Sequence, residues 1–128
     1  MSGVIARARA LDVADQLTGL GAVTVGRFFG GAALLIEGLQ FAFVIKGSLY
    51  LRVDAETRPE FEARGAEPFR YTGRSGLVTV ASYYEAPDDI AEDTEALRRW
   101  AARAHRAACL AAAKKPRRTL KRPPAGLG

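Results

Sequence analysis

The spacing of apolar residues changes twice along this chain, and the two changes restrict the folds open to it. Up to residue 17, apolar and small side chains recur at the spacing of a helix that packs on one side. From residue 22 to 54 the apolar residues form short runs separated by glycine-containing turns, and helical spacing returns after residue 88. We therefore expect an α+β fold: a single antiparallel sheet of four to five strands, flanked by an N-terminal helix and a long C-terminal helix.

The first helix is expected over residues 4–17. It would pack on the sheet through the apolar or small residues that share one face, namely Val4, Ala8, Leu11, Ala14 and Leu17. The following Thr18–Gly21 segment ends this helix, because a glycine accommodates the left-handed conformation that closes many helices.

Residues 23–54 predict a meander of adjacent antiparallel strands. The first is interrupted by Gly30-Gly31, which indicates either a bulge or a close approach of two backbones. Turns at Glu37-Gly38 and Lys46-Gly47-Ser48 separate the next two strands, residues 39–45 and 49–54. The last of these alternates regularly, so its odd-numbered residues face the core and its even-numbered residues face the other way.

The second half predicts a short helix, one or two strands and a long helix. Residues 55–63 form the short helix, 68–71 a short extended piece and 77–84 a further strand. Asp88 or Asp89 caps the final helix, which runs to residue 113. Its expected buried face consists of Leu97, Trp100, Ala101, Ala104, Ala108 and Ala111.

The positive charge of the chain is concentrated at its C-terminal end. Residues 1–113 carry 13 Lys and Arg against 14 Asp and Glu, whereas residues 114–128 carry six cations and no acid. We therefore expect one near-neutral domain over residues 1–113, followed by a basic and poorly ordered tail. The tail either serves only solubility or contacts nucleic-acid phosphates without sequence preference, through Lys114, Lys115, Arg117, Arg118, Lys121 and Arg122.

Residues able to support catalysis are sparse. His105 and Cys109 lie one helical turn apart and could form a Cys/His pair, but an isolated histidine and a packed cysteine explain them as well. The acids at residues 88–95 are explained by capping and by the dipole of the final helix. We expect no catalytic residue, metal site or cofactor.

A tyrosine–arginine surface is the stronger candidate for a functional site. Tyr50 and Arg52 project from the non-core side of one strand, and Tyr83 lies on a second strand. Together with Arg27 they are candidates for contact with a protein partner or a second copy of the chain, because Tyr and Arg are enriched at interfaces. Ordinary packing between neighbouring strands is the alternative.

The chain shows neither a signal peptide nor an apolar run long enough to cross a membrane. Its single cysteine excludes a disulfide within one chain and favours a reducing compartment. We expect a cytoplasmic protein.

An ordered set of short segments resembles the TfoX N-terminal domain family. The similarity covers roughly residues 10–113 and rests on residues 17–24, 27–31, 49–54, 61–65, 68–71 and 82–87, with Leu97 and Trp100-Ala101. The resemblance implies a compact α+β domain with an antiparallel sheet and no catalytic residues. Proteins of this family include regulators of natural competence, also called Sxy, which act on transcription alongside the cyclic-AMP receptor protein and carry a second, C-terminal domain.

Three functions remain open on the sequence. The leading expectation is a non-catalytic regulatory or interaction module of the TfoX N-terminal type, which binds a protein partner or itself. The first alternative is a protein that binds DNA directly through its basic tail, and the second is an enzyme or small-ligand binder built on the Cys/His pair.

Overall fold

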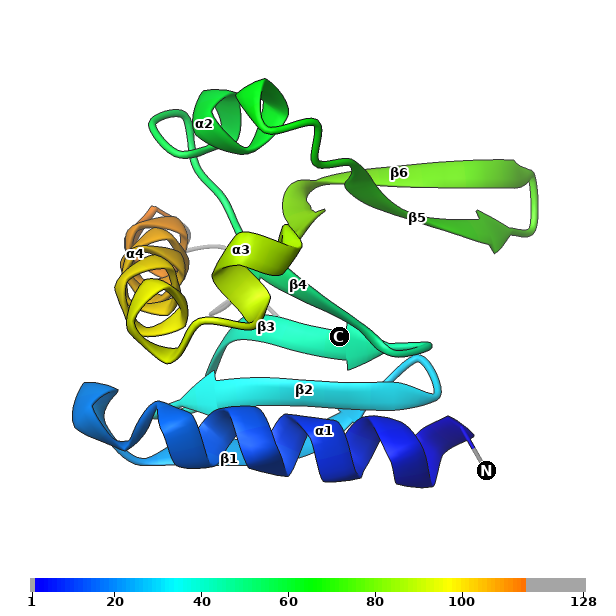
Figure 1. The fold of residues 1–128 in the computed structure, drawn as a ribbon. Coiled ribbons are helices and arrows are strands. Elements are labelled where there is room, and N and C mark those ends of the chain that lie inside the picture. Colours follow the sequence, from blue (N-terminus) through cyan, green and yellow to red (C-terminus); the bar gives the residue numbers. More distant parts are fainter. Residues whose placement is uncertain (1, 115–128) are drawn as a thin grey trace.

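The computed structural model describes residues 2–114, which form one sheet with helices on one of its faces (Figure 1). The α+β architecture predicted from the sequence is confirmed, with helices near both ends of the described chain. In chain order the elements are α1 Ser2–Gln16, the 3-10 helix Thr18–Leu20, β1 Val23–Phe28, β2 Gly31–Ile36, β3 Leu39–Ile45, β4 Ser48–Arg52, α2 Arg58–Ala63, β5 Pro68–Gly73, β6 Gly76–Glu85, α3 Asp88–Ala91 and α4 Thr94–Ala113.

The sheet has six strands in the order β1-β2-β3-β4-β6-β5, and all neighbouring pairs are antiparallel. This is more than the four to five strands expected. The additional strand arises because residues 23–36 form a hairpin and not one bulged strand. Phe29 and Gly30 make its turn, so β1 folds back onto β2 and Phe28 pairs with Gly31.

The first three hairpins are all closed by two-residue turns of the same kind. Both central residues of each turn have positive φ, as type I′ turns require, and such turns match the twist of the strands they join. The residues and their φ angles are Phe29 (48°) and Gly30 (79°), Glu37 (52°) and Gly38 (79°), and Lys46 (51°) and Gly47 (82°).

Gly31 bears out the second interpretation of the Gly30-Gly31 pair, the close backbone approach. A Cβ atom at Gly31 would overlap the carbonyl oxygen of Val44 on β3 and would lie 2.7 Å from Ile45 Cγ1. No side chain fits there, so glycine at this position allows β2 to lie against β3 directly after the turn.

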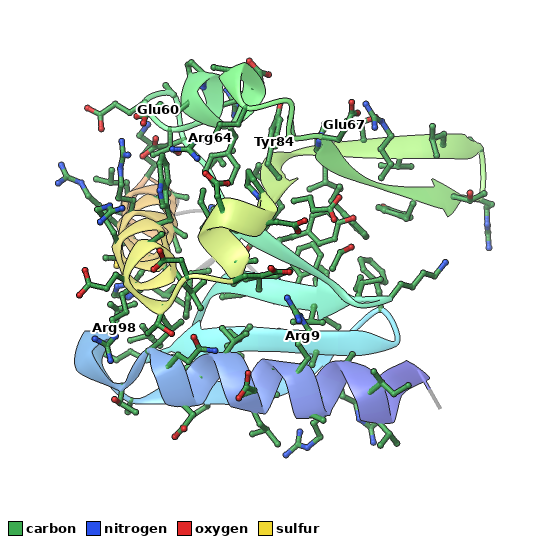
Figure 2. The ribbon with its side chains drawn as sticks, viewed as in Figure 1. Arg9, Glu60, Arg64, Glu67, Tyr84 and Arg98 are labelled. Atoms are coloured by element: carbon green, nitrogen blue, oxygen red, sulfur yellow. The ribbon has the colours of Figure 1, made fainter. Side chains whose placement is uncertain are left out.

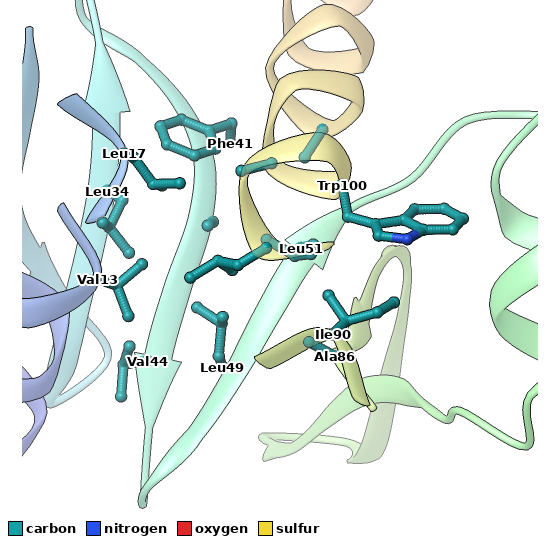
Figure 3. Packing of buried hydrophobic residues seen from close by; sticks show 14 of the residues in the cluster. Val13, Leu17, Leu34, Phe41, Val44, Leu49, Leu51, Ala86, Ile90 and Trp100 are labelled. Atoms are coloured by element: carbon teal, nitrogen blue, oxygen red, sulfur yellow. The ribbon is translucent and has the colours of Figure 1, made fainter. Parts of the chain in front are cut away.

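The main core lies between the sheet and the helices α1 and α4. Helix α1 contacts β1, β2 and β3, while α4 contacts β3 and β4. Figure 3 shows Leu34 and Phe41 of the sheet near Leu17, which directly follows α1, and Leu51 near α4, from which Trp100 extends. The expected core side of β4 is confirmed, because Leu49, Leu51 and Val53 are buried and the residues between them are only partly so.

Helix α1 forms as predicted, but it packs through a face that keeps only Ala14 and Leu17 of the five residues expected there. The buried residues are Ala6, Ala10, Val13 and Leu17, whereas Val4 and Leu11 are 72% and 48% exposed. Both sets have helical spacing. The small Ala6 and Ala10 allow the helix axis to lie close to the sheet, and Val4, Ala8 and Leu11 of the expected stripe therefore face outward.

The final helical region is divided in two. Asp88 and Asp89 begin the short α3, the chain bends at Glu92 and Asp93, and α4 starts at Thr94. The cap of α4 is Asp93, whose Oδ1 accepts hydrogen bonds from the N–H groups of Glu95 (2.9 Å) and Ala96 (3.2 Å). Five of the six residues expected on the buried face of this helix are in the core, namely Leu97, Trp100, Ala101, Ala104 and Ala108, whereas Ala111 is only half-buried.

Side-chain contacts fix α4 against α1 and α2 (Figure 2). Arg98 Nε donates to the carbonyl oxygen of Gln16 at the end of α1, at 3.0 Å. Arg103 Nη2 pairs with Glu60 Oε2 of α2 at 2.8 Å, and the guanidinium groups of Arg64 and Arg103 lie 5.3 and 4.6 Å from the Trp100 ring centre.

None of the helices within residues 2–114 has the length and hydropathy of a membrane span.

Candidate interaction surface

The sheet face opposite the helices carries a second, smaller core that is made mainly of aromatic rings. We call this group the aromatic cluster. It draws residues from β1, β3, β4, β5 and β6 and from the first hairpin turn, namely Phe28, Phe29, Phe43, Tyr50, Phe69, Tyr71 and Tyr83.

Phe43 stands at the centre of the aromatic cluster and is fully buried. Its ring centre lies 4.4 Å from that of Phe28, 5.0 Å from Tyr50, and 4.9 Å from both Phe69 and Tyr83. The alternation of side chains along a strand places Phe43 on this face while its neighbours Ala42 and Val44 face the helices. Phe43 thereby contacts rings from β1 on one side of it and from β4, β5 and β6 on the other.

The aromatic cluster also brings the two edges of the sheet together. Phe29, in the turn after edge strand β1, lies 5.2 Å from Tyr71 on the opposite edge strand β5, measured between ring centres. Only the last part of β6 pairs with β4, through Arg52↔Tyr83 to Tyr50↔Glu85, and the rest of the β5–β6 hairpin leans away from the other strands (Figure 1). The sheet is therefore strongly curled around its aromatic face.

An open cleft of about 430 Å³ lies at the mouth of this curl, and we call it the aromatic cleft. Its aromatic walls come from Phe29, Tyr50, Phe69 and Tyr71, and its remaining lining comprises Ile45, Lys46, Ser48, Arg70, Thr72 and Leu77. Two of these side chains are cations and none is a carboxylate, counting the residues that the structure describes. Phe29 and Leu77 are 65% and 69% exposed, so the cleft presents a large apolar surface to solvent.

Three of the four predicted contact residues lie together on this face. Strands β4 and β6 are neighbours, and Arg52 pairs directly with Tyr83, its Cζ 5.5 Å from the tyrosine ring centre. Tyr83 is only 6% exposed and donates its hydroxyl to the carbonyl oxygen of Gln40 at 3.1 Å. Burial raises the pKa of Tyr83, and burial together with the charge of Glu85 raises the pKa of Tyr50. Tyr83 thus supports the surface from beneath, and Tyr50 forms part of the cleft wall.

Arg27, the fourth predicted contact residue, lies elsewhere. Val23 and Val25 of β1 pack against the helix-side core, and Arg27 follows them on that same face of the strand. It is exposed beside Arg7 of α1, where both line a separate hollow. The structure therefore does not bring Arg27 together with Tyr50, Arg52 and Tyr83.

Phe29, Phe69 and Tyr71 are members of the site that the sequence does not predict. Phe29 continues an apolar run that predicts a strand, and residues 68–71 predict no more than a short extended piece. The available signal was the period-two spacing of Phe69 and Tyr71, which puts both rings on one face of β5. Their meeting with Phe29 depends on the curl of the whole sheet, which no local pattern specifies.

Cys109 and His105 are side by side on α4, as their spacing suggested. Cys109 Sγ lies 3.5 Å from His105 Nε2, both residues are half-buried, and the His105 ring packs edge-on against Phe41 at 6.0 Å. Phe41 offers the imidazole no hydrogen-bonding group that would orient it. No group of three or more His, Cys, Asp or Glu side chains that could hold a metal ion is found within residues 2–114.

Lys114 is the one predicted tail contact that lies within the described residues. It follows α4 and lines a groove of about 430 Å³ with Arg52, Arg58 and Arg106, to which Asp54 and Glu56 add two negative charges. The other five, Lys115, Arg117, Arg118, Lys121 and Arg122, lie outside the described residues, and their contact with nucleic acid stays a prediction.

The amino-acid sequence matches the model of a known protein family. The TfoX N-terminal domain model matches residues 15–108, from the end of α1 to the last turns of α4. The chain belongs to the TfoX N-terminal domain family. The resemblance inferred from the ordered segments is thereby confirmed, and the matched region contains every member of the aromatic cluster.

A relative of this TfoX N-terminal domain is the DNA transformation protein TfoX1 of Aliivibrio fischeri. The two are 33% identical over 69 residues, a segment that covers 50% of this chain and 32% of the relative. The matched segment therefore spans about a third of the length of that protein.

Proposed function

We propose that this TfoX N-terminal domain is a non-catalytic regulatory module that binds a protein partner in its aromatic cleft. The family and the name of its relative support a role in the regulation of competence. The proposal extends this by assigning the contact surface, which would use the rings of Phe29, Tyr50 and Tyr71 together with the cation of Lys46.

The observation that carries the proposal is the position of Phe29. Its ring is 65% exposed, although phenylalanine is among the residues most often buried. Its backbone has a φ of 48°, a conformation that an aromatic residue rarely adopts and that asparagine or glycine adopts more easily. The turn itself requires the positive φ, as at Glu37 and Lys46, but it does not require an aromatic ring. An exposed apolar ring at a position that asparagine would fill better is more typical of a contact surface than of a folding requirement.

The chemistry of the aromatic cleft indicates what the partner offers. Aromatic walls favour an apolar or aromatic side chain, because offset and edge-to-face ring contacts add to the gain from apolar burial. Lys46 is exposed in the cleft lining, and Arg70, which also lines the cleft, forms an ion pair with Glu67 at 3.0 Å. The expected partner segment therefore carries one or two large apolar residues next to an acidic one.

The test uses a substitution that removes the ring and improves the turn. Phe29→Asn should leave the domain folded with a nearly unchanged free energy of unfolding, because the preference of asparagine for positive φ offsets the lost ring contacts with Phe28 and Tyr71. The same substitution should sharply reduce recovery of the bound protein when the tagged domain is captured from its native cells. Glu37→Asn is the matched control, since it makes the same change at the equivalent turn between β2 and β3, away from the cleft, and should preserve recovery.

The proposal fails if Phe29→Asn and the unchanged chain recover the same proteins in the same amounts. A partner that is retained by Phe29→Asn but lost from a chain ending at Ala113 would instead place the contact in the basic tail. Such a result would favour the nucleic-acid alternative. If nuclease treatment of the captured complex also releases that partner, the contact runs through nucleic acid.

A further inference from the structure

Helix α1 exposes an apolar stripe on the side directly opposite its packed face. The stripe, which we call the α1 outer stripe, consists of Val4, Ala8 and Leu11 and ends at Asp15, at the spacing of one helix face. Val4 and Leu11 are 72% and 48% exposed, and the neighbouring Ile5 is 65% exposed. A helix already packed on its sheet gains nothing from apolar residues on its outer side, so this pattern indicates a second contact surface.

The charges along α1 run in the order least favourable for an isolated helix. Arg7 lies in the N-terminal half, and Asp12 and Asp15 lie in the C-terminal half; all three are exposed. The first turn contains no acid and the last turn no base, although a helix dipole favours acids at the start and bases at the end. A second α1 running antiparallel would correct this, because its acidic half would lie against the basic half of the first.

A hollow next to the α1 outer stripe fits the same arrangement. It measures about 620 Å³ and lies between the start of α1 and the β1–β2 hairpin. Val4, Arg7 and Arg27 line it with Ala32 and the backbone of Gly26, Gly30 and Gly31, and no carboxylate contributes among the described residues. The hollow therefore has two guanidinium groups and otherwise mostly small residues in its lining, so it has room for a carboxylate side chain of another molecule.

We propose that the occupant of this surface is a second copy of the chain. Two protomers pair through their α1 outer stripes, antiparallel about a two-fold axis, so that each surface meets itself. Ala8 of one protomer then lies opposite Leu11 of the partner subunit, and Arg7 lies within about one helical turn of the partner's Asp15. The acidic half of each helix thereby lies beside the basic half of the other. The inference goes beyond the proposed function and does not depend on it, because the aromatic cleft lies on the other side of the sheet.

The size of the contact predicts a weak dimer. Helix α1 has 15 residues, so it is about 22 Å long at about 1.5 Å per residue. A contact along one such helix lies at or below the low end of specific interfaces, about 1,200 Å² in total. We therefore expect dissociation in the micromolar range or above, with an equilibrium that depends on protein concentration.

Sedimentation velocity on the full chain over a range of concentrations tests the proposal. The weight-average mass should rise from the monomer value of 13.7 kDa toward twice that value as the concentration increases. Leu11→Lys should weaken association at least about tenfold, which corresponds to about 1.4 kcal/mol. Leu110→Lys, which replaces a leucine of similar exposure (45%) on α4, is the matched control and should leave association unchanged.

A charge exchange separates antiparallel pairing from nonspecific adhesion. Arg7→Glu and Asp15→Lys should each impair dimer formation alone, because the facing charges of the two helices are then alike. An equimolar mixture of the two variants should regain the dimer, since the carboxylate introduced at position 7 of one chain then faces the ammonium group introduced at position 15 of the other. Both substitutions are at exposed positions, and circular dichroism verifies that each variant remains folded.

Three results would overturn the proposal. They are a chain that remains monomeric at every concentration, a dimer that Leu11→Lys does not weaken, and a variant mixture that associates no better than either variant alone. In the first case some other molecule covers the stripe. In the second the dimer uses another face, and in the third the helices do not meet antiparallel.

Discussion

At the scale of single residues, the three hairpin turns show where sequence patterns are insufficient. Each turn pairs a residue of positive φ with a glycine, but the first residue is Phe29, Glu37 or Lys46. Asparagine and aspartate would have signalled such turns directly. Glu37-Gly38 and Lys46-Gly47 were identified because apolar runs flank them on both sides, whereas Phe29 itself continued the apolar run and concealed the turn.

Gly31 gives the first prediction at this scale. Gly31→Ala places a methyl group into the backbone of β3, because the Cβ position overlaps the Val44 carbonyl oxygen. Overpacking of this kind costs about 1–3 kcal/mol, and here backbone atoms must move. Urea denaturation should show a clear fall in the free energy of unfolding.

Gly26→Ala is the control for that measurement. A Cβ atom at Gly26 would meet Leu35 Cδ1 at 3.5 Å, an ordinary van der Waals distance, and the residue lies in the strand paired with β2. Alanine in a strand interior is favoured over glycine by about 0.5–1 kcal/mol. Equal destabilisation by the two substitutions would show that the close approach at Gly31 is not what limits this position.

At the scale of secondary-structure elements, the sequence predicts where helices lie better than which of their faces is buried. The predicted bounds of α1 are close to those found, but α1 carries two sets of apolar residues with helical spacing, and either could face the sheet. Burial of Ala6 and Ala10 in place of Val4 and Ala8 follows from how closely the helix backbone approaches β2. Periodicity alone cannot distinguish two such stripes, because the choice depends on the shape of the surface that receives the helix.

Helix α2 leads to a prediction about acid. Hydrogen bonds from Arg103 hold the pKa of Glu60 below its ordinary value. Burial works to raise the pKa of Asp54, but the N–H groups of Thr57 and Glu56 more than offset it, so that pKa is also lowered. A carboxylate with a lowered pKa contributes stability above its unfolded pKa and loses it as the pH falls through the folded value.

The free energy of unfolding should therefore decline as the pH falls below about 4.5, the usual range for unfolded carboxylates. Glu60→Gln should reduce stability at pH 6 and should show a smaller further decline between pH 6 and pH 3 than the unchanged chain. Glu92→Gln, at an exposed position after α3, is the control and should follow the unchanged chain. Identical pH profiles for Glu60→Gln and the unchanged chain would contradict a role for this ion pair in holding α2.

At the scale of the whole molecule, the sheet performs two tasks with its two faces. The face toward α1 and α4 was predicted well, because Leu49, Leu51 and Val53 alternate in the sequence as buried strand residues do. Of the seven residues of the aromatic cluster, the sequence predicted only Tyr50 and Tyr83 as part of a contact surface. The other members of the cluster come together because the sheet curls. The curl arises because β6 pairs with β4 only near its end, and the rest of β6 leans away with β5.

That curl leads to a prediction about how the molecule opens. The β5–β6 hairpin is attached through the three residue pairs between β4 and β6, a hydrogen bond from Val53 N–H to the Ser82 carbonyl oxygen, and the rings of Phe69 and Tyr71 in the aromatic cluster. Most of β6 between Gly76 and Ala81 is exposed. Regions with few buried contacts open at lower free energy than the global unfolding reaction. In hydrogen exchange, amides of residues 77–80 should exchange faster than those of residues 41–44 in β3.

Phe69→Leu should widen this difference, because it removes ring contacts with Phe43 and Tyr50 that tie the hairpin to the central strands. A substitution of this size costs about 1 kcal/mol, and we expect most of it to appear as faster exchange in β5 and β6. Phe61→Leu, in the helix-side core next to Trp100, is the matched control and should not act selectively on the hairpin. If Phe69→Leu accelerates exchange equally in β3 and β6, the sheet opens as one cooperative unit. The aromatic cleft would then be a rigid surface, and a partner would have to fit it without movement of the hairpin.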